Sequence, residues 1–319
     1  MFALKQYAQP ISIRRLGMAA AFALLVVAGG FHEALAAGAE QTRFPSPEEA
    51  VKALVQAVKA GDMKTLAAIL GAEAKPLVSS GDAVADKQAH ERFVQEYEQA
   101  NRLEKAGEGK AILVLGQDNW PFPIPLVKQD DVWRFDTAAG KQEILNRRIG
   151  RNELSAIQVC QAYVDAQREY AREDHDGDGL LKYAMKFVSD GGKKNGLYWE
   201  TKEGEAPSPL GPLVANARAA GYSAKQTGGK PTPYYGYFYK ILTAQGKDAP
   251  GGAYDYVVNG KIIGGFALVA YPAQYGVSGV MTFIVNHDGI VYQKDLGQNT
   301  AADAANMTTF NPDTSWKRL

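Results

Sequence analysis

The first third of the chain carries apolar residues at helical spacing. Between Ser46 and Asp62 they form one stripe, made of Val51, Leu54, Val55 and Val58. This spacing predicts an amphipathic helix, which Ser46 is placed to cap and Gly61 is placed to end. The pattern returns more briefly over 63–71 and again over 86–101, so two further helices are expected there.

The hydrophobic period then changes from helical to alternating. Three segments are expected to be strands: 110–116, 121–129 and 131–137. Asp130 and Asp131 mark a hairpin turn, and the prolines that alternate through the middle segment predict an edge strand. Helices followed by such a meander resemble the cone-shaped α+β folds related to nuclear transport factor two. We therefore expect residues 45–150 to form an N-terminal α+β domain of that kind.

The second half predicts a long helical region followed by a β-rich region. The helical pattern runs from about 141 to 148, is interrupted near Gly150 and restarts as far as about 171. Cys160 falls on its inward stripe, so we expect this thiol to pack in the core. Apolar or alternating segments follow at 234–242, 264–272 and 279–297. Residues 151–319 are therefore expected to form a helix packed on an antiparallel sheet.

The N-terminus predicts an export signal. Basic residues precede an apolar run from Leu16 to Gly30, and the segment 34–36 (ALA) supplies small residues for cleavage. The apolar run is short for a membrane span, which needs about twenty residues. We expect residues 1–36 to be a signal peptide and the protein to be periplasmic or secreted. The alternative is an uncleaved anchor.

Composition narrows the classes of function. With residues 1–36 removed, the basic side chains fall from 35 to 32 and the acidic side chains from 35 to 34. This balance gives no general attraction for nucleic acid or for an acidic membrane. The single cysteine excludes an intramolecular disulfide, so the fold must depend on core packing. The sequence contains no nucleotide-binding fingerprint, nucleophile elbow or histidine pair with zinc spacing.

The segment 173–183 (EDHDGDGLLKY) carries four carboxylates within six residues. The residues that match the opening of an EF-hand loop are Asp174, Asp176, Asp178 and Gly179. Carboxylates at alternate positions can converge on a hard cation, and the glycine permits a sharp turn. The segment therefore predicts a calcium site.

The second half of the EF-hand pattern is missing. Lys182 stands at its ninth position and Met185 at its twelfth, where a bidentate glutamate is needed. An incomplete loop could still bind calcium, with the Leu180 carbonyl or Glu173 as a further ligand. The alternative interpretation is a solvated turn that ends the helix.

Two groups of aromatic side chains could line binding surfaces. The first group is Trp120, Phe122 and Trp133, and the second is Tyr235, Tyr237 and Tyr239. Aromatic residues at alternate positions also build half-buried sheet faces, which is the alternative interpretation of both groups.

Longer stretches carry two resemblances. The first resemblance rests on stretches spread in order over residues 45–319, which include DNWPFPIPLV, WRFDTAAGKQEIL, PSPLGPLV and FNPDTSWKR. Through these stretches the chain resembles a bacterial exported family known as a domain of unknown function, twenty-nine fifty in words. This resemblance implies no activity. Through GYFYKIL and NHDGIVY the second half also resembles the globular heads of type IV pilins and pseudopilins. The ordinary export signal departs from a pilin, so this second resemblance implies a fold and not polymerisation.

These observations favour a non-catalytic envelope protein that binds a protein or cell-wall partner and carries a structural calcium. One alternative is a periplasmic hydrolase with a carboxylate-based site. Another is a carrier of a small ligand, which requires a large and mainly apolar cavity.

Overall fold

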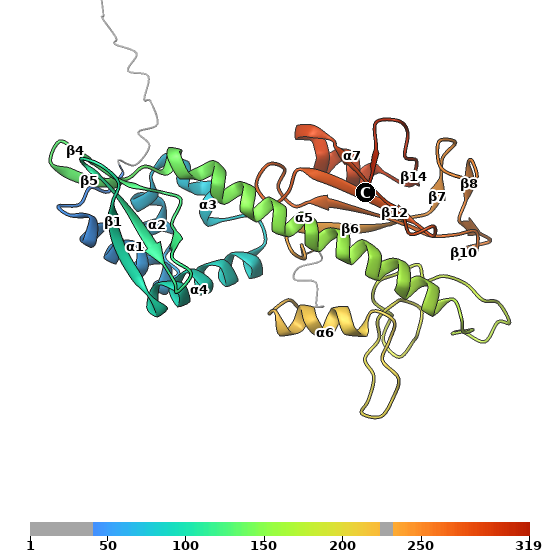
Figure 1. The fold of residues 1–319 in the computed structure, drawn as a ribbon. Coiled ribbons are helices and arrows are strands. Elements are labelled where there is room, and N and C mark those ends of the chain that lie inside the picture. Colours follow the sequence, from blue (N-terminus) through green and yellow to red (C-terminus); the bar gives the residue numbers. More distant parts are fainter. Residues whose placement is uncertain (1–40, 224–231) are drawn as a thin grey trace, which may run out of the picture. The chain divides into compact units, whose positions relative to one another are not determined.

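The computed structural model describes residues 41–223 and 232–319, which belong to one compact unit and are drawn in colour in Figure 1. The predicted signal peptide, residues 1–36, lies outside the described residues. Helices and antiparallel sheets occupy separate stretches of the chain, so the fold is α+β as predicted. Within the described ranges, no helix is both long enough and apolar enough to cross a membrane.

The described chain begins with a group of helices. They are α1 (Pro47–Ala60), α2 (Met63–Leu70), the 3-10 turn η1 (Ala72–Ala74), α3 (Lys75–Val78) and α4 (Ala83–Gln99). α1 has the predicted caps: the Ser46 side chain accepts a hydrogen bond from the Glu49 N–H (3.2 Å), and Gly61 ends the helix with a φ of 62°. α4 begins three residues before its predicted start, because Asp82 caps it by accepting hydrogen bonds from two N–H groups of the first turn.

The first sheet is a meander of short antiparallel strands. They are β1 (Asn101–Lys105), β2 (Lys110–Leu115), β3 (Trp120–Pro121), β4 (Leu126–Gln129) and β5 (Val132–Phe135). Their order is β1-β2-β4-β5, with β3 also paired to β2. The predicted turn between β4 and β5 is confirmed: Asp130 and Asp131 have φ angles of 51° and 61°, as a tight hairpin requires. β1 was not predicted, because Leu103 is its one residue that packs against the core.

The prediction of an edge strand over 121–129 is wrong. Pro121 and the strand β4 pair with β2, but Pro123 and Pro125 lie between them outside any strand. β4 is central, between β2 and β5. A proline has no N–H to donate to a ladder, so the chain leaves the sheet at Pro123 and Pro125 and pairs again only from Leu126.

One helix, α5 (Thr137–Tyr170), runs without a break through Gly150. The predicted interruption there is wrong. A glycine inside a helix costs only about 1 kcal/mol relative to alanine, and packing along the rest of α5 outweighs that cost. Cys160 is fully buried as predicted, and burial raises the pKa of its thiol to about 12.

α5 packs on a second antiparallel sheet with the strand order β15-β13-β12-β11-β6. These strands are β6 (Tyr237–Leu242), β11 (Ala267–Pro272), β12 (Met281–Asn286), β13 (Val291–Asp295) and β15 (Lys317–Arg318). Leu268 and Ala270 of β11 pack in the same core as α5. Ala267 and Val269 belong to a different cluster, together with Ala304 of helix α7 (Thr300–Asn306). Because both faces of β11 are buried, its sequence is a continuous apolar run instead of an alternating one.

The remaining elements are short. They are α6 (Gly211–Ala219), β7 (Ala244–Gln245), β8 (Tyr254–Asp255), β9 (Val257–Val258), β10 (Lys261–Ile262), the 3-10 turn η2 (Gly297–Asn299) and β14 (Thr309–Phe310). β9 pairs with β10, and β7 lies between β14 and β8. The finer likenesses to nuclear transport factor two and to pilin heads stay predictions, as does a domain boundary at residue 150.

Candidate cation site

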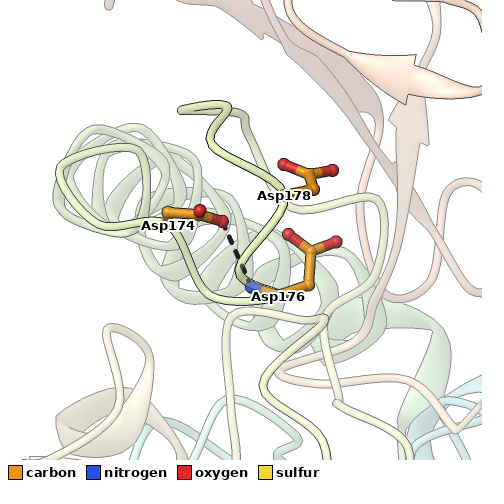
Figure 2. A group of neighbouring side chains, drawn as sticks. All are labelled: Asp174, Asp176 and Asp178. Atoms are coloured by element: carbon orange, nitrogen blue, oxygen red, sulfur yellow. Dashed lines mark hydrogen bonds between the residues drawn. The ribbon is translucent and has the colours of Figure 1, made fainter.

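The acidic loop that was predicted to bind calcium lies directly after α5. The helix ends at Tyr170, and the chain then turns through Gly177 and Gly179, whose φ angles of 73° and 78° suit glycine. The loop brings together the carboxylates of Asp174, Asp176 and Asp178 (Figure 2). One oxygen of each lies within 4.8 Å of the others. In residues 41–223 and 232–319, no second group of three or more His, Cys, Asp or Glu side chains converges in this way.

Backbone N–H groups hold Asp174 in place. Its Oδ1 accepts a hydrogen bond from the Gly177 N–H (2.9 Å), and its Oδ2 accepts one from the Gly179 N–H (2.7 Å). The bond from Gly179 is the largest cause that lowers the pKa of Asp174 below its ordinary value. The carboxylate is therefore ionised and oriented by the loop itself.

Two lysines neutralise part of the cluster. Lys182 Nζ forms ion pairs with Asp176 and with Asp178 Oδ2 (2.7 Å), and Lys261 Nζ lies 2.5 Å from the same Oδ2. Hydrogen bonds from Lys182 and then Lys261 lower the pKa of Asp178. Three carboxylates and two ammonium groups leave a net charge of −1. A divalent cation that used the paired oxygens of Asp176 and Asp178 would compete with these ammonium groups.

Only one of these two lysines was noted in the sequence. Lys182 was recognised as one of the two residues that break the EF-hand pattern, and the structure gives it two carboxylate partners. Lys261 was missed because it comes from β10, 83 residues away from Asp178. No local pattern predicts a contact across that separation.

Three residues near the aspartates in the sequence differ in whether they contact the carboxylates: Leu180, Glu173 and His175. The Leu180 N–H donates a hydrogen bond to Asp178 Oδ1 at 3.1 Å, while Glu173 is not part of the converging group. His175 turns back to the helix end: its Nε2 lies 2.9 Å from the Tyr170 carbonyl oxygen. The converging ligand atoms are therefore all carboxylate oxygens, which suit a hard cation such as calcium.

The first aromatic group lies at the edge of the N-terminal core. Trp120 and Phe122 come together with ring centroids 6.2 Å apart, and Phe122 also contacts Phe93 of α4 at 5.5 Å. Trp133 packs against the same core from β5. All three side chains are half-buried, as in a packed sheet face.

The tyrosines do not form one ladder. Tyr237 is fully buried and its hydroxyl donates a hydrogen bond to the Met281 carbonyl (2.9 Å), while Tyr239 packs partly buried against the same core. Tyr235 precedes the strand in a turn, with a φ of 50°. The predicted alternation therefore begins at Tyr237, because the turn places Tyr235 outside the sheet.

Tyr235 instead lines a pocket that was not predicted. The pocket has a volume of about 260 Å³, and Arg92 of α4 together with Arg148 and Arg151 of α5 forms part of its wall. A signal for it exists in the basic run 147–151 (RRIGR), because residues three apart share a helix face. Arg92 joins the group only through the packing of the two helices.

Comparisons with known proteins place the chain in a family. No curated protein and no solved structure matches it. A family model described as "Protein of unknown function (DUF2950)" matches residues 41–319, nearly the whole chain. The resemblance found in the sequence is thereby confirmed, and the chain belongs to the DUF2950 family.

Proposed function

We propose that this protein is exported to the periplasm or secreted, and that it is a non-catalytic binding protein of the cell envelope. Its partner is a protein or a cell-wall component, and calcium fixes the loop that follows α5. The signal-like pattern of residues 1–36 supports export. A binding role agrees with the two proposed likenesses, since both folds serve binding modules. These are the likeness of residues 45–150 to nuclear transport factor two and that of residues 151–319 to pilin heads.

The observation that carries the calcium part of the proposal is the convergence of Asp174, Asp176 and Asp178 within 4.8 Å. Carboxylate oxygens arranged around a short glycine-turned loop are the ligands calcium prefers. The net charge of −1 that remains beside the two lysines favours a further cation. Release of Lys182 from Asp176 and Asp178 would free ligand oxygens for the ion.

Thermal unfolding in excess calcium and then in EDTA tests the proposal. With calcium at about a hundredfold over its dissociation constant, the melting temperature of the wild type should rise by roughly 5 °C. The double variant Asp176→Ala, Asp178→Ala should lose this rise. Lys182→Met should show the rise at lower calcium concentrations, because the ion no longer competes with an ammonium group.

Asp190→Ala is the matched control. Asp190 is another exposed aspartate, paired with Lys186 at 2.7 Å outside the cluster, so its removal changes the net charge without touching the loop. This variant should keep the calcium response. Identical wild-type melts in calcium and in EDTA would show that the lysines alone neutralise the loop and that it is a solvated turn.

A further inference from the structure

The pocket between α4 and α5 gathers positive charge at the protein surface, where Arg92 and Arg151 are exposed and Arg148 is half-buried. Its volume is about 260 Å³, several times the share of one water molecule. Arg92, Arg148 and Arg151 line it, and Asp86 is the one acidic residue among its lining residues. Three guanidinium groups and one carboxylate leave a charge of +2 on its wall.

The three arginines differ in how they are held. Arg148 donates hydrogen bonds to the carbonyl oxygens of Pro76 and Leu77, both at 2.6 Å, so its guanidinium is fixed at the pocket. Arg92 and Arg151 have no hydrogen bond from their guanidinium groups and no ion pair to any residue that the structure describes. Their donors are therefore available to a ligand.

Asp86 offsets part of this charge, and its field raises the pKa of Arg148 against the larger lowering by burial, but it forms no ion pair with the arginines. Its Oδ2 accepts a hydrogen bond from the Ser80 N–H (2.9 Å), and its Oδ1 accepts one from the Ser80 hydroxyl (2.7 Å). These bonds tie the carboxylate to the segment before α4. No ion pair within 4.0 Å joins Asp86 to an arginine in the described ranges.

The positive charges of the three arginines repel one another, and a bound anion would reduce this repulsion. Although Arg151 is exposed, partial desolvation of its side chain, followed by the charges of Arg92, Arg148 and Arg147, lowers the pKa of its guanidinium below its ordinary value. Burial is also the largest cause that lowers the pKa of Arg148. A bound anion would offset this repulsion, and its oxygens would accept hydrogen bonds from the free N–H groups.

We propose that this pocket binds a phosphate-type dianion, either inorganic phosphate or the phosphate group of a small monoester. The charge of +2 on the pocket wall matches a dianion. Guanidinium groups from two helices line the pocket, and arginine forks pair well with the several acceptor oxygens of such a group. This site is separate from the acidic loop and does not depend on calcium.

Isothermal titration calorimetry in EDTA, at constant ionic strength set with sodium chloride, tests the site. Inorganic phosphate and glycerol 3-phosphate are the two probes. We expect saturable binding of one anion per chain, weakened by about tenfold or more in the double variant Arg92→Gln, Arg151→Gln. Tighter binding of inorganic phosphate identifies the free ion as the ligand class, and tighter binding of the ester identifies a phosphorylated small molecule.

Arg147→Gln is the control on the same helix. Arg147 pairs with Glu143 and lies over the Trp120 ring at 5.2 Å, so its loss removes one positive charge without removing a lining residue. It should change the affinity by no more than about twofold, because only a screened field is altered. Equal loss in the control and in the double variant would overturn the proposal, as would the absence of saturable heat with the wild type.

A melting experiment separates binding from a structural role. Arg151→Gln should raise the melting temperature in phosphate-free buffer, because it relieves repulsion, and it should reduce the rise that phosphate gives to the wild type. A structural role for Arg151 predicts a lower melting temperature in both buffers. That outcome would also count against the site.

Discussion

At the scale of single residues, Asp82 shows how a buried charge is accommodated. It is only 1% exposed, and its two oxygens accept four hydrogen bonds. Oδ1 caps α4 through the N–H groups of Val84 and Ala85, while Oδ2 accepts from the Tyr222 hydroxyl (2.9 Å) and from the Gly236 N–H (2.8 Å). The carboxylate thus ties the start of α4 to segments 140 and 154 residues away.

Replacing Asp82 with asparagine should destabilise the fold by roughly 1–3 kcal/mol. Asparagine caps a helix as well as aspartate does, so the cap survives. Its amide N–H₂ would face the Gly236 N–H, however, and leave that donor without an acceptor. Chemical denaturation of the variant and the wild type measures the difference.

Asp62→Asn is the comparison for this prediction. Asp62 caps α2 by accepting a hydrogen bond from the Thr65 N–H (3.0 Å), and its site is exposed. The same chemical change should leave the unfolding midpoint nearly unchanged there, since water solvates the new amide. Equal losses at both positions would mean that the distant partners of Asp82 contribute nothing.

At the scale of elements, α5 contains two glycines that differ in whether a larger side chain would fit. A Cβ on Gly140 would lie 2.4 Å from the Pro123 carbonyl oxygen and 2.7 Å from the Ile124 Cα, so the helix touches backbone at this point. A Cβ on Gly150 would meet no atom within 4 Å beyond its own turn of helix. The first glycine is required by packing, whereas the second is a plain helical position.

Gly140→Ala should therefore destabilise the protein by about 2 kcal/mol or more, because backbone cannot move aside as a flexible side chain can. Gly150→Ala should stabilise it by up to about 1 kcal/mol through helix propensity. Thermal unfolding of the two variants beside the wild type measures both effects. A loss of stability in Gly150→Ala would mean that the helix is strained at the predicted interruption.

At the scale of the whole molecule, the described residues form separate hydrophobic clusters on either side of the middle of α5. One cluster draws its buried residues from positions 44–145, and the next along the chain from 156–291. α5 contributes Leu145 to the first and Ala156 to the second. The continuous helix is thus a covalent connection between them.

We expect the wild type to unfold in one calorimetric transition and Gly150→Pro to unfold in two. Proline removes a helical hydrogen bond and costs about 3 kcal/mol inside a helix, which weakens the connection without touching either cluster. Gly150→Ala should keep the single transition. One lowered transition in Gly150→Pro would show that residues 45–150 and 151–319 do not fold as separate domains.

The sequence by itself determined what depends on near neighbours. Side-chain spacing over a few residues predicted α1, the hairpin at Asp130-Asp131 and the buried face of α5 that carries Cys160. The alternation of aspartates with glycines likewise predicted that three carboxylates converge. Each of these features is set by helix or turn geometry within one or two turns of chain.

Only the tertiary structure decided contacts between distant segments. It brought Lys261 to Asp178, buried Tyr237, and placed Arg92 beside Arg151 around one pocket. It also kept α5 continuous where glycine propensity favoured a break. The physical reason is the same in each case: these outcomes depend on which surfaces the folded chain brings together, and local spacing carries no information about that.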